Sequence, residues 1–516
     1  MMKSKRFMGS IVASVVVSTL LVGCSTSNNG NPPSDSPKKS EAPGATSTAA
    51  TVPGKEVTLN ILFPGDPPKD LDAVNAAIAK KLQADGLNMK LNYTFVPWES
   101  YTNKQSLVVA AGENYDLTWT HISNLSQGAS KNVLMPLDDL LASSGPGLLK
   151  DISDFVWKAV KVDGKTYAIP RVVPVAQSND TFQIRGDLRK KYNLPEIKSS
   201  SDFEKYLEAV KTNDPTITPL AGGAGGLVRE IAPSYFANGD FTGSFFYIDV
   251  NETPLKVKNL FASKAYEQYV NKTREWYKKG YLPSDPNMFK DINGDFTKGR
   301  MAAMPSNILR PTEVIDALKT NLPNAELEFV QFASDKPKYI YTSADNLLSV
   351  LATSKHPKEA VAFVNWLHSS QENYDLFSLG VKDVNYKANG NSASYEGISP
   401  DKQYFPISWA WTDLRYNKFS KFITPAQLDV IKTWDNGAVQ TPLIGFSINT
   451  EPVKAELAKV SAIASEYSTQ GPLMNGIVDF SSVKDKFLSR LNDAGIDKVL
   501  AEYQKQLDAF LAQQKK

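Results

Sequence analysis

The 516-residue chain has one cysteine and three histidines, and its charges nearly cancel. Scarce Cys and His exclude zinc, iron–sulfur and thiol centres, so we expect no metal and no cofactor. Lys and Arg number 57 against 55 Asp and Glu, a net charge of +2 without a long basic run. That balance gives no sign of nucleic-acid binding. The mean hydropathy of −0.30 is typical of a soluble protein with two or three domain-sized units.

The single cysteine, Cys24, ends a stretch that is typical of a secretory signal. A basic start precedes the apolar run 11–22, which is too short to span a bilayer. The tetrapeptide that ends at Cys24 resembles the bacterial lipobox. That resemblance implies a signal peptide over 1–23 and a diacylglycerol- and palmitate-bearing Cys24 at the extracytoplasmic face of the cell membrane. The alternative is an ordinary signal peptide with an incidental cysteine.

Residues 24–54 follow the signal and are dominated by Ser, Thr, Asn, Gly and Pro, with no aromatic residue. Such a composition cannot bury enough apolar surface to order itself. The segment therefore predicts a flexible tether between the lipid anchor and the working part of the protein.

A regular alternation of strand and helix patterns begins after the tether. Alternating apolar residues predict strands over 57–63, 89–96 and 115–119, and helical spacing predicts helices over 71–82 and 99–111. Strands that alternate with helices at this spacing favour a parallel sheet in an α/β fold. Ligands of such sheets bind beyond the carboxyl ends of the strands.

Several longer segments, in their order along the chain, resemble family 1 extracellular solute-binding proteins, the lipoprotein receptors of ATP-binding-cassette (ABC) importers. The C-terminal stretches 441–467 and 476–512 resemble a domain of unknown function from a subgroup of mostly sugar or oligosaccharide receptors. The segments that carry the family resemblance are the lipobox with its tether, ENYDLTWTHISNLSQGASKNVLMPLDDLL (113–141), DGKTYAIP (163–170), FTKGRMAAMPSN (296–307) and SKHPKEAVAFVNWLHSSQENYDLFSLG (354–380).

The resemblance implies a two-lobed, type II periplasmic-binding-protein-like α/β fold with a helix-rich C-terminal part. Lobe 1 is expected over 55–169 plus 337–385, and lobe 2 over 170–336 plus 386–512, with the ligand in the cleft between them. The family's mechanism is hinge closure on a sugar or oligosaccharide and delivery to an ABC permease in the membrane. It implies a monomeric receptor with no catalytic residue.

Aromatic side chains are the first candidates for sugar contacts, because sugars present apolar faces that stack on rings. Trp98 and Trp119 stand at or beside predicted strand ends. Trp409 and Trp411 are two residues apart and would share a face in an extended segment. We expect Trp119 and Trp409 to lie on either side of the ligand, from opposite lobes.

Polar candidates follow the same strand ends and the expected hinges. Asp66 follows the first strand, behind Gly65, and His121 follows the third. Arg185 and Asp187 follow the first expected hinge and Asp345 follows the second, and all three are candidates for ligand contacts. An ion pair between Arg185 and Asp187 explains those two residues almost equally well.

Two further motifs do not predict sites. DINGDF (291–296) begins like a calcium loop but has Phe296 and Ala302 where that loop needs Gly and Glu. AGGAGG (221–226) lacks the lysine of a phosphate loop and favours a flexible connection.

Two other function classes stay open from the sequence. One is an extracellular, lipid-anchored carbohydrate-active enzyme, a glycoside hydrolase or lyase with two carboxylates. The other is a receptor for a non-sugar solute such as a peptide. The order of the family segments favours the sugar receptor.

Overall fold

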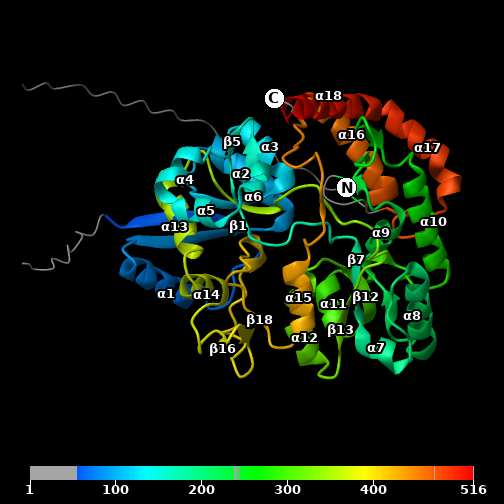
Figure 1. Cartoon of the computed structure of the whole chain (residues 1–516), viewed down its shortest axis with the longest axis horizontal. Helices are drawn as coiled ribbons and strands as arrows, with labels where there is room; N and C mark the ends of the chain where they lie inside the picture. The colour runs from blue at the N-terminus through cyan, green and yellow to red at the C-terminus, as the bar shows by residue number, and fades with distance from the viewer. Residues whose placement is uncertain (1–54, 238–240, 242, 470, 515–516) are drawn as a thin grey trace, which may run out of the picture. The chain divides into compact units, whose positions relative to one another are not determined.

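The computed structural model describes residues 55–237, 241, 243–469 and 471–514 (Figure 1). The expected signal peptide and tether, with Cys24, lie outside these residues. The described residues belong to one compact unit. Among the described helices, none has the length and apolar character needed to cross a bilayer.

The first sheet has the strand order β2-β1-β3-β15-β6, and it defines what we call the first lobe. β1 is parallel to both β2 and β3, as the sequence predicts, and β15 runs antiparallel to β3. The strands are β1 (Val57–Pro64), β2 (Met89–Val96), β3 (Leu117–His121), β6 (Ile169–Pro170) and β15 (Asn346–Val350).

Helices cover this sheet because their apolar residues recur at helical spacing. Val74, Ile78 and Leu82 of α1 are fully buried, and they pack in the same core as β1. The helices of the first lobe are α1 (Leu71–Ala84), α2 (Trp98–Ala110), α3 (Ile122–Ser130), α4 (Asp138–Ser144), α5 (Pro146–Asp151), α6 (Asp154–Trp157), α13 (Pro357–Leu367) and α14 (Gln371–Leu379).

The second sheet has the order β13-β7-β12-β8 and defines the second lobe. β7 runs antiparallel to both of its neighbours, β12 and β13. The strands are β7 (Thr181–Arg185), β8 (Thr218–Leu220), β12 (Met301–Ser306) and β13 (Leu327–Val330). The helices around them are α7 (Gly186–Lys191), α8 (Ser200–Asn213), α9 (Val228–Ile231), α10 (Lys264–Lys278), α11 (Ile292–Thr297) and α12 (Arg310–Asn321).

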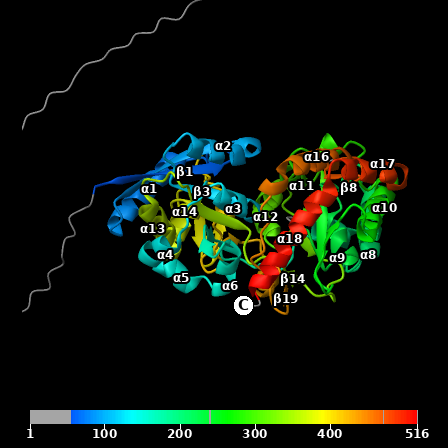
Figure 2. The same cartoon turned by 90° about the horizontal axis from the view of Figure 1, so that it is seen from above.

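The C-terminal helices pack on the second lobe rather than forming a core apart. Val460, Leu473, Phe487 and Leu491 share a buried cluster with Phe182 of β7, and both views show these helices beside that lobe (Figures 1 and 2). They are α16 (Lys454–Ala464), α17 (Phe480–Asp493) and α18 (Ile496–Gln514). The helix α15 (Pro425–Thr433) packs through Ile431 in a separate cluster with Ile308 and Ile340.

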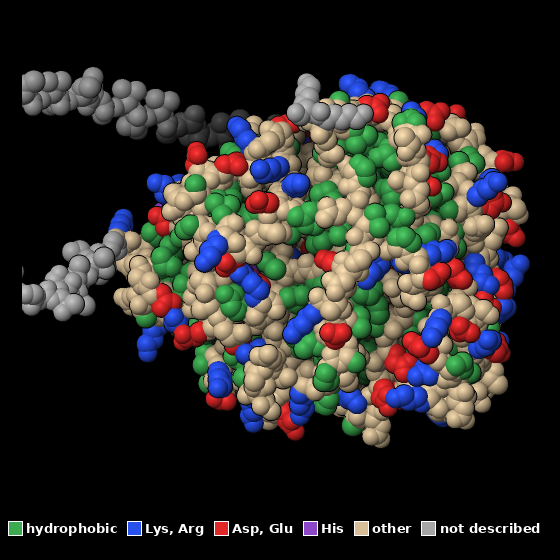
Figure 3. Space-filling model, viewed as in Figure 1, with side chains coloured by type: hydrophobic (Ala, Val, Ile, Leu, Met, Phe, Trp, Pro, Cys, Tyr) green, Lys and Arg blue, Asp and Glu red, His purple; other side chains and the backbone are tan. Residues whose placement is uncertain are grey.

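Smaller sheets complete the described structure. On the visible face, basic and acidic side chains are interspersed rather than gathered by sign (Figure 3). One small sheet combines β9 (Tyr235–Phe236), β10 (Phe246–Asp249) and β11 (Val257–Asn259), and another combines β16 (Lys387–Asn389), β17 (Ser392–Ser394) and β18 (Phe419–Ser420). Two further sheets have two strands each: β14 (Tyr339–Ile340) with β19 (Val439–Gln440), and β4 (Lys161–Val162) with β5 (Lys165–Thr166).

Trp411 belongs to the core of the first lobe, although it lies in the range 386–512 that was expected for lobe 2. Its ring stacks on Phe63 at a centroid distance of 5.7 Å, and its Nε1 donates to Ser378 Oγ over 2.9 Å. A 3-10 turn over Ser408–Ala410 replaces the expected extended backbone. The expectation that Trp409 and Trp411 share a face is therefore wrong.

We expect Trp411→Ala to lower the free energy of unfolding by about 3–5 kcal/mol, because it empties a packed core position. Trp98→Ala is the matched control: Trp98 is 49% exposed, so its loss should cost no more than about 1.5 kcal/mol. Chemical denaturation measures both. Equal losses for the two variants would contradict the burial described above.

Candidate ligand-binding site

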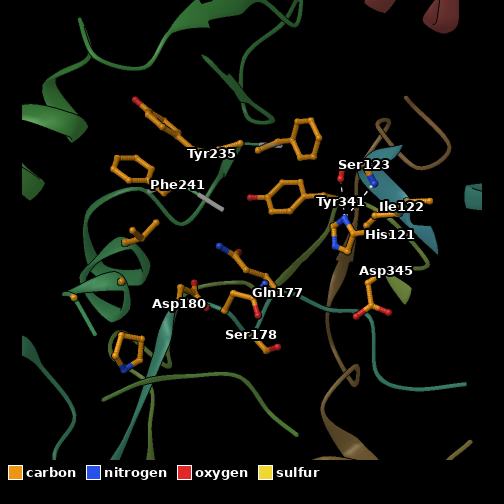
Figure 4. A pocket seen from close by; sticks show the side chains of 18 of the residues that line it. His121, Ile122, Ser123, Gln177, Ser178, Asp180, Tyr235, Phe241, Tyr341 and Asp345 are labelled. Carbon is orange, nitrogen blue, oxygen red and sulfur yellow. Dashed lines mark hydrogen bonds between the residues drawn. The ribbon is translucent and has the colours of Figure 1, made fainter. Parts of the chain in front are cut away.

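A cavity of about 940 Å3 lies among residues of both lobes and of the C-terminal segment. Its volume is within the range of about 300–1,000 Å3 that is common for small-molecule sites. Tyr235 and Phe241 lie on one side and His121 and Asp345 on the other (Figure 4). Residues that line the cavity include His121, Ser123, Gln177, Ser178, Asp180, Gly222, Gly223, Tyr235, Phe241, Tyr341, Asp345, Phe446 and Asn475.

Asp180 is the most unusual group in this cavity. Its side chain is 4% exposed, and neither carboxylate oxygen accepts a hydrogen bond from another described residue. Burial raises the pKa of Asp180 to about 6, against the opposing effect of the Arg229 guanidinium. Arg229 is itself fully buried and donates instead to the carbonyls of Lys336 and Pro337. Asp180 is therefore a buried acceptor whose partner the protein does not supply.

Aromatic rings form much of the second-lobe side of the cavity. Tyr235 of β9 stacks on Tyr247 at 4.1 Å, and burial raises its pKa to about 12. Phe236 packs against Tyr341 at 5.6 Å, and the Tyr341 hydroxyl donates to the Pro233 carbonyl. These contacts fix the rings in place, so they offer rigid apolar faces beside the polar groups.

His121 caps the amino end of α3 and lines the cavity from the first lobe. Its Nδ1 lies 2.8 Å from Ser123 Oγ and 3.3 Å from the Ser123 backbone N–H, and in the tautomer in which Nδ1 accepts from both, Nε2 carries the proton and is the donor. Burial lowers the pKa of His121, and Arg171 adds to this while Asp345 opposes it. The ring is neutral at pH 7 and is able to donate one hydrogen bond.

Asp345 lines the cavity next to His121 and is paired, unlike Asp180. Arg171 Nε donates to Asp345 Oδ1 over 2.7 Å, and a second guanidinium nitrogen reaches Oδ2. Burial alone would raise the pKa of Asp345, but Arg171 outweighs it and the pKa lies below its ordinary value. Arg171 also donates to the Trp409 carbonyl over 2.7 Å.

Three of the predicted tryptophans meet in one cluster next to His121. The rings of Trp98 and Trp409 stack at 5.7 Å, and Trp119 meets both of them edge-on. The Trp119 ring lies 6.3 Å from the His121 ring, which connects the cluster to the cavity. Because Trp119 and Trp409 are in direct contact, the expectation that they face each other across a ligand from opposite lobes is wrong.

The other predicted polar residues lie away from the cavity lining. Asp66 is exposed, and Gly65, at φ +89°, leaves room for Trp98, whose Nε1 would be 3.3 Å from a Cβ there. Arg185 and Asp187 form an ion pair at the carboxyl end of β7, and the Glu326 amide also donates to Asp187. Their role in binding stays a prediction.

Sequence reasoning missed Asp180, Gln177 and the second-lobe rings. The signal was available, since Asp180 directly precedes the β7 strand after the first expected hinge. The segment AGGAGG was expected to be only a flexible connection. Two of its residues, Gly222 and Gly223, line the cavity, with φ angles of +83° and +98°. In DINGDF, Asp291 caps α11 by accepting from the Gly294 N–H, and no cluster of three metal-binding side chains occurs among the residues described.

Two α/β lobes around a shared cavity define the class of bilobal binding proteins. Residues 77–391, more than half of the chain, match the family of bacterial extracellular solute-binding proteins, and the protein belongs to this family. Residues 442–512 match a domain of unknown function (DUF3502). The family predicted from the sequence is confirmed, and membership implies an extracytoplasmic location.

Relatives with known names agree with this assignment. A carbohydrate ABC transporter substrate-binding protein of Streptococcus pneumoniae serotype 4 is 24% identical over 477 residues, which cover 91% of this chain and 94% of the relative. The fructooligosaccharide ABC transporter substrate-binding protein FusA of the same organism is 26% identical over 328 residues, 58% of this chain and 56% of the relative.

Solved structures confirm the predicted two-lobed α/β fold. The N-glycan transport solute binding protein NgtS from Streptococcus pneumoniae superposes with a TM-score of 0.73 at 22% identity, covering 89% of this chain and 99% of that one. The alginate-binding protein AlgQ2 superposes with a TM-score of 0.63 at 19% identity and the same coverage.

We expect Asp180→Asn to stabilise the unliganded protein at pH 7 by on the order of 2 kcal/mol, because it removes a buried charge without a partner. The folded-state pKa lies above the ordinary value of 3.8, so Asp180 costs stability as the pH rises from about 4 to about 6. The gain should therefore disappear near pH 4. Unfolding curves at both pH values check this, and a gain that does not depend on pH would contradict the assignment.

Proposed function

We propose that the protein binds an oligosaccharide in the cavity and delivers it to an ABC permease, while Cys24 anchors it to the extracytoplasmic face of the membrane. The observation that carries the proposal is Asp180, a buried carboxylate without a partner, beside fixed aromatic rings. A sugar complements both, because its hydroxyls donate hydrogen bonds and its C–H faces stack on rings.

The polar groups across the cavity suit the same ligand. With His121 Nδ1 accepting from Ser123, His121 Nε2 is a donor, and Gln177 Oε1 is a buried acceptor for which no partner occurs among the described residues. Trp98, Trp119 and Trp409 extend the aromatic surface beyond His121, which suits a ligand longer than one sugar unit. Named relatives support this: crystal structures exist of NgtS with Man1GlcNAc and Man5GlcNAc, and of FusA with kestose.

The charge of the lining favours a neutral oligosaccharide over an acidic one. Asp180 and Asp345 line the cavity, and no Lys or Arg does so among the described residues. A uronate would bring a second carboxylate next to Asp180, and no Lys or Arg of the described lining could pair with it, which is costly in a buried site. The fold that the protein shares with AlgQ2 does not by itself imply alginate as the ligand.

A thermal-shift screen with Man5GlcNAc, kestose and an alginate oligosaccharide tests this function. A neutral ligand that binds only the folded state should raise the melting temperature in a concentration-dependent way, and the alginate oligosaccharide should not. Incubation followed by product analysis tests the enzyme alternative. Sugar release would contradict a pure receptor, and stabilisation by the alginate oligosaccharide alone would contradict the charge argument.

We expect Asp180→Asn to weaken binding of the stabilising sugar by about 10- to 100-fold, the scale of a lost hydrogen bond to a charged group. Asp202→Asn is the matched control, since Asp202 accepts a hydrogen bond from Ser199 Oγ at the start of α8 and does not line the cavity. Calorimetric titration should show unchanged affinity for the control. Equal losses in both variants would mean that Asp180 does not touch the ligand.

We expect Cys24→Ala to release the protein from membranes, because a diacylglycerol-modified Cys24 would be the attachment point. Fractionation of cells that express the full chain measures this. A variant that still sediments with lipid after a high-salt wash would contradict the lipid anchor.

A further inference from the structure

The C-terminal segment, which matches a domain of unknown function, reaches the cavity directly. Phe446, Ser447, Ile448 and Thr450 line it from the loop 445–451, and Asn475 lines it from the turn before α17. We propose that residues 442–512 are a third wall of the binding cavity and that the loop 445–451 ties this wall to the first lobe. The inference rests on the proposed function of the cavity and assigns a role to this segment within it.

The loop is held from behind by α18. Asn449 N–H donates to Gln506 Oε1 over 2.8 Å, and Gln506 Nε2 donates back to the Asn449 carbonyl over 2.9 Å. Leu443 and Val453, at the two ends of the loop, share a buried cluster with Tyr503 of the same helix. A loop fixed by a reciprocal amide pair and by apolar packing can present Phe446 as a rigid surface.

The other side of the loop contacts the first lobe, where Gln127 Nε2 of α3 donates to Glu451 Oε1 over 3.5 Å. Glu451 Oε1 also pairs with Lys131 Nζ at 2.7 Å, and Lys131 is the C-cap residue that directly follows α3. Gly445, at φ +86°, lies so close to the first lobe that a Cβ would be 3.1 Å from the Lys158 carbonyl oxygen. Because α3 begins next to His121, the ion pair joins the wall to the same helix that carries a cavity residue.

Phe446 and the Lys131–Glu451 ion pair contribute to binding in different ways. Phe446 is a ring in the cavity lining, and its removal takes away apolar contact with the ligand. The Lys131–Glu451 pair is partly exposed, with 41% and 29% of the side chains accessible. Its contribution is small and screened by salt, so it biases the lobe arrangement rather than locking it.

Phe446→Ala tests the wall. Man5GlcNAc is the probe, and calorimetric titration of the full mature chain should show about a five-fold or larger loss of affinity. Phe510→Ala is the control, because the Phe510 ring of α18 packs against Phe446 at a centroid distance of 5.4 Å and does not line the cavity. A smaller loss for Phe510→Ala supports the wall. Equal losses, or none, would overturn it.

Lys131→Gln tests the contact that ties the loop 445–451 to the first lobe, and Lys454→Gln is its control. Both lysines pair with Glu451, but Lys131 does so across to the first lobe and Lys454 within the C-terminal segment. We expect Lys131→Gln to weaken Man5GlcNAc binding by about two- to five-fold at low salt, and Lys454→Gln to leave it unchanged. The double variant Lys131→Glu/Glu451→Lys should restore affinity. Equal effects of the two lysines would overturn the tie.

A measurement without ligand separates this inference from the proposed function. In a double-mutant cycle of Lys131→Gln and Glu451→Gln, the free energies of unfolding should be non-additive at low salt and additive at high salt. Additivity at both salt concentrations overturns the tie, whatever the ligand. If wild type binds no sugar in the screen, the proposed function fails and the wall fails with it, while the cycle still decides the tie.

Discussion

The guanidinium of Arg171 holds together the parts of the first lobe that face the cavity. It follows β6, pairs with Asp345 just before β15, and donates to the carbonyl of Trp409 in the 3-10 turn. One planar group thus joins three segments that are far apart in the sequence, and it does so with 10% of its side chain exposed. Without it, the Asp345 carboxylate would lose its cation partner and the Trp409 carbonyl would lose its donor.

The two carboxylates of the cavity have different roles, one in the stability of the site and the other in ligand binding. Asp345 is satisfied by Arg171, and its pKa is low despite burial. Asp180 lies near Arg229, but the two terminal nitrogens of Arg229 donate to the carbonyls of Pro337 and Lys336 and not to Asp180. Asp345 therefore supports the frame of the site, whereas Asp180 stays available to a ligand at a cost to the empty protein.

Much of the fold could be predicted because its signals are local. Period-two and helical patterns locate β2 and α1, since each buries one regular face. The site could be predicted only in part. His121 and Asp345 line the cavity, but Trp411 turned into the core because a 3-10 turn, set by tertiary contacts, replaced an extended segment. The position of Phe446 in the cavity lining depends on packing between α18 and the loop before α16. No local sequence pattern predicts such packing.

Strand direction explains which polar residues reach the cavity. In the first lobe, Asn346 of β15 pairs with His121 of the antiparallel β3, so the amino end of β15 and the carboxyl end of β3 share one edge.

The second lobe repeats this arrangement. Thr181 at the amino end of β7 pairs with Ser306 at the carboxyl end of β12. Asp180 therefore lies at the cavity edge, and Arg185, at the other end of β7, lies at the far edge. The rule that ligands bind beyond carboxyl ends holds for the parallel strands. For a strand that returns antiparallel after a crossing between lobes, the residue before the strand occupies the equivalent position.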